Sequence, residues 1–401
     1  MVCAPHVLRV LLVLAAIAMG AAQNGAAQAS RDTTTFASLA SQAEAARNAD
    51  RLAEAESLYK RALVLHPHWT EGWWSLGTIA YDRDSYEEAE RAFVRVTNLA
   101  PNNGNAFVMR GLAEFELERN ELALQHLEKG MRLGIDQSEN LRQVALYHRG
   151  VLLQRTGKFQ AAKDTLEQLC RQGVESAAEF RLLGMVLVRS RSRQAPADGS
   201  EDAAILDQIG RAGCLAGQKK FDDAKQILSA AVASHPTYPN IHYAFGLVLL
   251  GANDSVAAEG EFKKEIENNN SDLVSRLQIA AALYKSNSAE GLIYAQEAVK
   301  LAPREPFAHY LDGMLLLDTG DYQAAIPELQ FAHKAYPREA KIYIALASAY
   351  SGAGRHQEAA QIRAEFSRVS QERRPASESV SEPHSGHSEE ISMDSVHTDA
   401  Q

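Results

Sequence analysis

The most informative absences in this sequence are catalytic motifs and alternating apolar runs. No G-x-G-x-x-G, G-x-x-x-x-G-K, H-E-x-x-H, C-x-x-C or G-x-S-x-G motif occurs in the 401 residues. The chain therefore lacks the local signatures of common nucleotide-binding, metallohydrolase, thiol-redox and serine-hydrolase sites. Runs that alternate apolar and polar residues are also lacking, which disfavours a β-sheet. The sequence thus indicates no enzyme, no cofactor and no metal site.

Cysteine is scarce, and the little that is present leaves its pairing open. The chain has three cysteines, Cys3, Cys170 and Cys214. An exported protein can join such residues in a disulfide. A bridge, however, needs Cα atoms within about 7 Å, and the last two cysteines lie on different repeats, as argued below. We expect Cys170 and Cys214 to be two separate buried thiols.

Basic charge is outweighed by acidic charge. The chain has 41 Lys and Arg against 51 Asp and Glu, a formal net charge of −10, and no basic stripe interleaved with aromatic residues. This disfavours nucleic acid as a partner. Half of the net charge comes from residues 371–401, which are rich in Ser, Glu, Pro and His. We expect an acidic disordered tail over residues 369–401. Its histidines, His384, His387 and His397, leave open a weak metal site, but their spacing favours a solvating tail.

The N-terminal residues 1–29 are typical of a secretory signal peptide. Arg9 precedes the apolar run 10–19, which is too short to cross a bilayer. The Ala-Gln-Ala sequence at 27–29 fits a cleavage site, and Gly-Ala-Ala at 20–22 is a second choice. We expect an exported protein, periplasmic or secreted, without a membrane span after cleavage. An uncleaved N-terminal anchor is the alternative.

A repeated pattern of bulky, small and proline residues organises the rest of the chain. Between residues 70 and 101 it consists of Trp73, Leu76, Gly77, Ala89, Phe93 and Pro101. The order W-x-x-L-G, A-x-x-x-F, P resembles the tetratricopeptide repeat, whose period is about 34 residues. Degenerate copies continue from Phe36 to about Phe366. The resemblance implies an all-α fold, an α-solenoid superhelix of helix hairpins stabilised by contacts between neighbouring repeats.

The repeats predict a division of the chain. Residues 36–174 hold about four repeats, residues 175–204 a half repeat and linker, and residues 205–368 about five repeats. The linker contains Pro, Gly and clustered charge, which are loop signals. It acts either as a hinge or as a change of superhelix direction. Its arginines, Arg189, Arg191 and Arg193, belong to a solvated linker or form an anion site. Pro327 falls inside an expected helix and indicates either a kink or a late helix start.

The resemblance also implies a site. In this family certain places on the first helix of each repeat line a concave groove, and here they are aromatic. The candidate groove residues are Trp74, Tyr81, Phe115, Tyr147, Tyr243, Tyr284, Phe307 and Tyr310. Aromatic side chains give large contact areas at low entropy cost. The sequence therefore predicts a non-enzymatic scaffold that binds an extended peptide or partner protein. The alternative is a structural accessory subunit of an envelope enzyme or of a secretion or assembly complex. For the aromatics themselves, the alternative is that they only pack one helix against the next.

Overall fold

The computed structural model describes residues 33–135 and 139–372, and these are helical with no strand. The expectation of an all-α solenoid built from helix hairpins is confirmed. The signal peptide expected at 1–29 lies outside the described residues. So does most of the expected tail, although the last helix continues to Glu372. Within the described part of the chain, no helix combines the length and the apolar character needed to cross a membrane.

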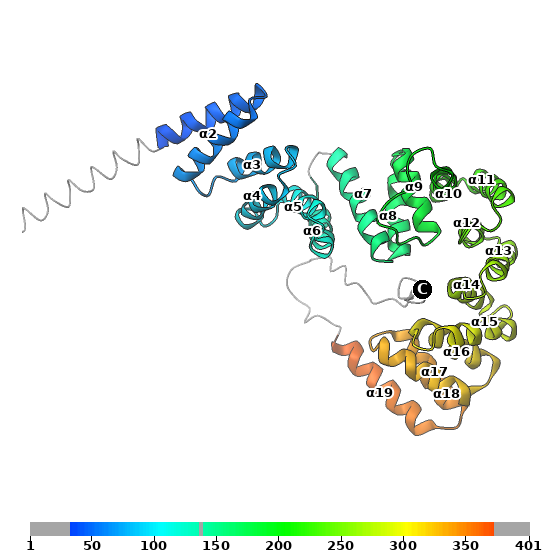
Figure 1. Cartoon of the computed structure of the whole chain (residues 1–401). Coiled ribbons are helices and arrows are strands. Elements are labelled where there is room, and N and C mark those ends of the chain that lie inside the picture. The colour runs from blue at the N-terminus through cyan, green and yellow to red at the C-terminus, as the bar shows by residue number, and fades with distance from the viewer. Residues whose placement is uncertain (1–32, 136–138, 373–401) are drawn as a thin grey trace, which may run out of the picture. The chain divides into compact units, whose positions relative to one another are not determined.

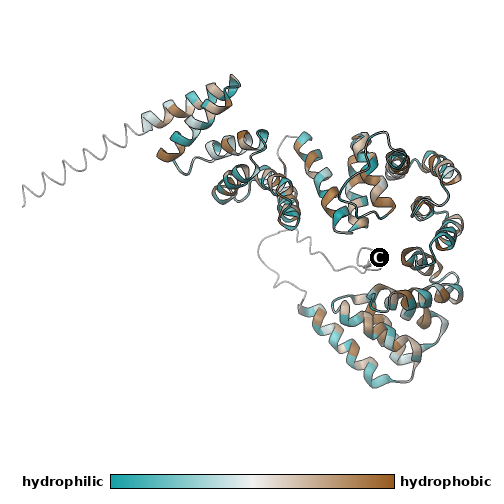
Figure 2. Cartoon of the chain, viewed as in Figure 1, coloured by the Kyte–Doolittle hydropathy of each residue, from teal (hydrophilic) through white to brown (hydrophobic). Residues whose placement is uncertain are grey.

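The chain divides into two compact units, residues 1–149 and 150–401, with the boundary inside α7 (Figure 1). Unit 1 begins with a helical segment at 33–48. It continues with α2 (Leu52–Leu65), α3 (Thr70–Asp82), α4 (Tyr86–Leu99), α5 (Gly104–Glu116), α6 (Asn120–Leu133) and the first part of α7 (Glu139–Arg155). Most helices carry hydrophobic and hydrophilic residues together, as amphipathic packing requires (Figure 2).

Unit 2 contains the end of α7 and all later helices. These are α8 (Phe159–Arg171), α9 (Ala177–Leu187), α10 (Glu201–Gly217), α11 (Phe221–Ser234), α12 (Ile241–Gly251), α13 (Ser255–Asn268), α14 (Leu273–Leu283), α15 (Ser288–Leu301), α16 (Pro306–Thr319), α17 (Tyr322–Ala335), α18 (Ala340–Gly352) and α19 (His356–Glu372). From α10 onward the helices pair in sequence into hairpins, and below we call the first helix of each hairpin A and the second B.

Each hairpin closes around a small residue on helix A. A Cβ atom at Gly77 would lie 2.8 Å from Phe93 Cε1, and one at Gly246 would lie 2.4 Å from Phe262 Cε1. Both phenylalanines are completely buried. The glycine therefore lets the aromatic ring of helix B sit directly on the backbone of helix A, which is the close approach that the repeat pattern predicts.

The turn after helix A also recurs. Asp84, two residues after the end of α3, has a φ of 57°, and the amide of Ser85 then donates to the carbonyl of Ala80 at 2.9 Å. This is the left-handed ending that satisfies the last carbonyls of a helix. Arg189 takes the same conformation after α9, with a φ of 56°. Helix α9 therefore ends as a helix A does, although no helix B follows it directly.

The region around α9 departs from the hairpin pattern. Residues 188–200 form no helix, and α9 packs against α10, the helix A of the next hairpin. The contact is close, because a Cβ at Gly210 would lie 1.7 Å from the carbonyl oxygen of Phe180. The loop itself is bound to its surroundings: Gln154 Nε2 donates to the carbonyl of Ser192 at 3.1 Å. Whether residues 189–204 act as a hinge stays a prediction.

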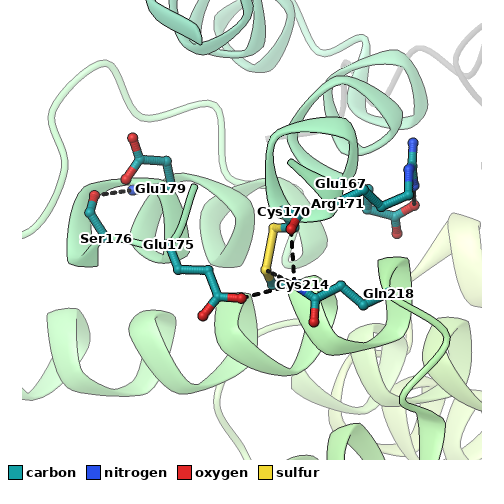
Figure 3. Close-up of a disulfide and its surroundings, with 8 residues drawn as sticks. All are labelled: Glu167, Cys170, Arg171, Glu175, Ser176, Glu179, Cys214 and Gln218. Atoms are coloured by element: carbon teal, nitrogen blue, oxygen red, sulfur yellow. Dashed lines mark hydrogen bonds and ion pairs between the residues drawn. A yellow bond between two sulfur atoms is a disulfide. The ribbon is translucent and has the colours of Figure 1, made fainter. Parts of the chain in front are cut away.

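The expectation of two separate thiols is wrong. Cys170 at the end of α8 and Cys214 on α10 form a disulfide, with their Cα atoms 5.4 Å apart (Figure 3). The sequence places them on different repeats, but α10 packs directly against α8 beside the half repeat. Both cysteines are buried. Gln218 covers the bridge by donating from Nε2 to the carbonyl of Cys170 at 2.9 Å and to Glu175 Oε1 at 2.8 Å.

Helix α17 begins at Tyr322 and continues through Pro327. The alternative of a late helix start is therefore wrong, because the helix begins before Pro327. Pro327 has no N–H to donate, so α17 lacks one backbone hydrogen bond within its first two turns.

Candidate functional site

In unit 1, two of the candidate groove residues lie on α3 and share one cluster. Trp74 and Tyr81 are half-buried and pack against a core that includes Phe93. The rings of Trp74 and Phe93 meet edge to face with centroids 5.6 Å apart. Burial raises the pKa of Tyr81 to about 12, with help from the carboxylates of Glu116 and Asp82. The phenol of Tyr81 therefore stays protonated at neutral pH and can donate a hydrogen bond.

The other two candidates of unit 1 meet at a histidine. Phe115 on α5 and Tyr147 on α7 are both half-buried. Their ring centroids lie 4.7 Å and 5.5 Å from that of His148, each in an edge-to-face arrangement. The structure thus brings these two residues to one place and leaves part of each side chain at the surface.

In unit 2, two candidates behave as core residues. Tyr243 is 3% exposed and Phe307 is 7% exposed. Tyr243 packs near Phe262, with ring centroids 5.8 Å apart. The guanidinium of Arg189 lies 5.9 Å from the ring centroid of Tyr243 and 4.7 Å from that of Phe159. These two residues offer almost no surface to a partner. Arg189 faces aromatic rings, which argues against an anion site built from the linker arginines.

The remaining candidates of unit 2 keep exposed surface. Tyr284 follows α14, Tyr310 lies on α16, and both are half-buried against the cluster that contains Tyr243 and Phe307. Half-buried apolar side chains on or directly after the A helices α12, α14 and α16 pack against this cluster or against the cluster that contains Leu316 and Leu346. We call this set the A-helix patch: Leu247, Leu250, Tyr284, Tyr310, Met314 and Leu317. Burial raises the pKa of Tyr310 to about 12, so its hydroxyl also remains protonated.

A feature that the sequence analysis missed fixes the start of several A helices. Trp73 Nε1 donates to the carbonyl of Pro67 at 2.9 Å, six residues earlier. Equivalent bonds join His242 Nε2 to Pro236 and His309 Nε2 to Pro303, each at 3.0 Å, and the hydroxyl of Tyr343 to Pro337 at 2.8 Å. We call this bond the proline clasp. A donor six residues after a repeat-ending proline is the sequence signal that reveals it.

Two of the clasps include a carboxylate from helix B. His242 Nδ1 lies 2.6 Å from Glu261 Oε2, and His309 Nδ1 lies 2.5 Å from Glu328 Oε2. Each histidine therefore bridges the end of the preceding repeat and both helices of its own. Each also precedes a tyrosine of the predicted groove. Glu265 adds a second tie near the first clasp, because its carboxylate accepts from the amides of Asn240 and His242 at the start of α12.

No group of three or more His, Cys, Asp or Glu side chains that could hold a metal ion lies within residues 33–135 and 139–372. The pairs described above instead tie helix to helix. What the arrangement offers chemically is a set of aromatic and apolar surfaces with protonated phenols, carried by hairpins of which several are clasped.

Comparison with known proteins places the repeats in a family. Segments described as tetratricopeptide repeat match at residues 40–97, 75–136, 144–172, 277–330 and 316–367. Together these segments cover more than half of the chain. No curated protein sequence matches it.

Several solved structures are similar in part. MamA from Desulfovibrio magneticus is 18% identical, with 42% of this chain and 98% of that one covered and a TM-score of 0.38. A tetratricopeptide repeat protein from Parabacteroides merdae is 14% identical, with 71% and 99% covered and a TM-score of 0.32. Yeast Tom70 is 14% identical, with 84% and 69% covered and a TM-score of 0.32. The matching segments, together with the hairpins closed by glycine and proline, show that the chain belongs to the tetratricopeptide repeat family.

Proposed function

We propose that the chain is a non-enzymatic scaffold that holds an extended segment of a partner protein against the A-helix patch of unit 2. The observation that carries the proposal is that Tyr284 and Tyr310 keep exposed surface while their neighbours Tyr243 and Phe307 are buried. A tyrosine with a fixed ring and a protonated hydroxyl suits recognition, because it gives contact area at little entropy cost. The buried pair serves to hold the exposed pair in place.

The aromatic residues of unit 1 offer a second surface of the same kind. Trp74, Tyr81, Phe115 and Tyr147 are all half-buried. Carboxylates stand beside Tyr81, where Asp82 and Glu116 are exposed. A segment bound there would combine apolar side chains with positive charge.

We further propose that the protein is exported, to a periplasm or to the exterior. The sequence of residues 1–29 is typical of a signal peptide. The disulfide between Cys170 and Cys214 supports the same conclusion, because such bonds persist in oxidising compartments and are rare in the cytosol.

A capture experiment from an envelope fraction tests the scaffold. The wild-type chain serves as bait beside the double variant Tyr284→Ala, Tyr310→Ala, and Ile293→Ala serves as a control because Ile293 is 56% exposed outside the patch. We expect a discrete partner that the wild type and the control retain and the double variant loses. Each tyrosine should be worth about 2 kcal/mol or more of binding if it is a hot spot.

Two outcomes would contradict the proposal. Equal capture by the double variant, with an unchanged melting temperature, would show that the patch does not bind. Co-purification of a large complex that ignores the double variant would instead favour a structural accessory subunit.

A further inference from the structure

One carboxylate of unit 2 occupies a place that other repeats give to an apolar residue. Three residues after the clasp donor, the sequence has Leu76, Phe245 and Leu346 in three hairpins, and Asp312 in α16. Asp312 is 5% exposed, and its Oδ1 is buried with no hydrogen-bond partner in the described chain. An unpartnered carboxylate in such a place strongly favours the neutral, protonated form.

The clasp of the same hairpin also favours a protonated group, in this case a charged imidazolium rather than a neutral acid. His309 Nδ1 faces Glu328 on α17 at 2.5 Å, and Nε2 faces the carbonyl of Pro303 at 3.0 Å. Both partners are acceptors, so only the doubly protonated imidazole ring can donate to each of them. The ring of Phe331 stacks over the imidazole at 4.0 Å and limits access of water to it.

Both groups therefore bind protons more tightly in the folded hairpin than in the unfolded chain. Burial, followed by repulsion from Glu328, raises the pKa of Asp312 to about 7. For His309, burial lowers the pKa, but the hydrogen bonds to Glu328 and Pro303 and the nearby negative charge outweigh burial and raise it above its usual value. A folded-state pKa above the unfolded one means that stability falls as pH rises. For Asp312 the fall runs from about pH 4 to about pH 7, and for His309 it continues through the raised pKa.

The surroundings do not oppose this effect. The two charged groups that act on Asp312 are Glu328 of α17 and His309 of its own helix. Helices α14, α15 and α18 also pack against α16, but none of their charged groups is among those that act on Asp312, and Tyr284 and Glu339 act on Tyr310 instead. Pro327 stands directly before Glu328 and deprives α17 of a backbone hydrogen bond there, which weakens the helix at the clasp.

We propose that the α16–α17 hairpin is a proton-sensitive joint in unit 2. It is closed while His309 carries both ring protons and Asp312 is neutral, and it opens locally as the solution passes from mildly acidic to mildly alkaline. The joint exists whether or not the chain binds a partner. Because α16 carries Tyr310 and Met314 of the A-helix patch, opening would also dismantle part of that patch, and this consequence rests on the proposed function.

The α12–α13 hairpin, which precedes α14–α15 in the chain, provides an internal comparison. His242 makes the same two contacts, with Glu261 and with the carbonyl of Pro236. The place of Asp312 is taken there by Phe245. The α16–α17 hairpin therefore differs in having a buried acid on helix A with an unpartnered oxygen, whereas the buried Glu265 of α13 accepts from backbone amides.

Hydrogen exchange measured by mass spectrometry on the exported chain, at pH 6 and pH 8 and corrected for intrinsic rates, tests the joint. In the wild type, peptides from α16 and α17 should open roughly tenfold more at pH 8 than at pH 6. Across this range Asp312, with a pKa of about 7, changes from mostly protonated to mostly ionised in the folded hairpin, whereas in the opened chain it is ionised throughout. Asp312→Asn should remove most of this ratio and should protect the hairpin at pH 8. His309→Gln should reduce protection at pH 6 and should lower the ratio of exchange between pH 8 and pH 6.

Two further variants keep the test decisive. Asp312→Leu restores the apolar residue of other repeats and should behave like Asp312→Asn, so a folding failure of either one leaves the other. Phe245→Asp should increase the pH dependence of exchange in the α12–α13 hairpin. An equal exchange ratio in the wild type and in both Asp312 variants would overturn the joint. If the joint holds but capture of a partner does not change with pH, only its link to binding fails.

Discussion

The disulfide between Cys170 and Cys214 allows the packing around the half repeat to be tested with a magnitude. The two residues are separated by 44 positions in the sequence. For a closed loop of this length, the loss of chain entropy in the unfolded state stabilises the native state by about 4 kcal/mol. Contacts in a repeat array are between nearest neighbours, so the loss on reduction should fall first on α8, α9 and α10.

Urea unfolding of the oxidised and the reduced protein, followed by circular dichroism, measures this loss. With a slope of about 2–3 kcal/mol per molar urea, a loss of about 4 kcal/mol lowers the midpoint by about 1.3–2 M. The double variant Cys170→Ala, Cys214→Ala should unfold near the reduced wild type. Adding reductant to that variant should change nothing, which makes it the control for side effects of the reductant.

Two results would refute different parts of this reasoning. If thiol titration of the unfolded protein, purified from an oxidising compartment, found both cysteines free, the bond itself would be refuted. If the bond were present and the two midpoints coincided, the loop-entropy argument would fail. The second result would mean that the contact of α10 with α8 persists in the unfolded state of the reduced protein, so that the disulfide removes little chain entropy.

Three further outcomes are expected. Gly246→Ala should destabilise the protein by about 1–3 kcal/mol, because its Cβ would meet the ring of Phe262 at 2.4 Å. Gly260→Ala, with nothing within 4 Å of the new Cβ, should stabilise by up to about 1 kcal/mol, and equal thermal melts of the pair would contradict this. Phe262→Ala should cost about 3–5 kcal/mol of folding and Tyr284→Ala clearly less, as chemical denaturation would measure. A fusion of residues 1–35 to a reporter that is active only outside the cytoplasm should be active, and an inactive, cytoplasmic fusion would count against export.

The fold could be predicted because it depends on local patterns that repeat. The spacing of Gly77, Ala89 and Phe93 encodes a close contact between two helices, and the structure has that contact. Pro327 shows the limit of this logic. The sequence admits a kink or a late start. In the structure the helix begins at Tyr322, where the side chain of Asp321 accepts from the amide of Ala324, and it runs through the proline while packed against α16 and α18.

The candidate site could be predicted in kind and less well in detail. The repeat frame assigns Tyr243 and Tyr284 equivalent roles, yet one is in the core and the other is half-buried. Tyr243 lies within α12, near Phe262 and with Arg189 from the loop after α9 over its ring, whereas Tyr284 follows the last residue of α14. A contact between residues so far apart in the sequence has no local signature. The same reason hid the disulfide, whose formation depends on how α9 leaves α8 and α10 in contact.

The proline clasps show why degenerate repeats can keep one geometry while their chemistry diverges. The clasp needs a bulky side chain whose tip donates a hydrogen bond, and indole, imidazole and phenol all meet that need at Trp73, His309 and Tyr343. Phe107, six residues after Pro101, supplies the bulk without the donor. Because the fold accepts any of these, selection for stability alone leaves the choice open. Imidazole is the one choice among them that changes charge near neutral pH. A histidine at this place therefore adds a response to protons to a junction whose mechanical role an indole or a phenol fulfils equally well.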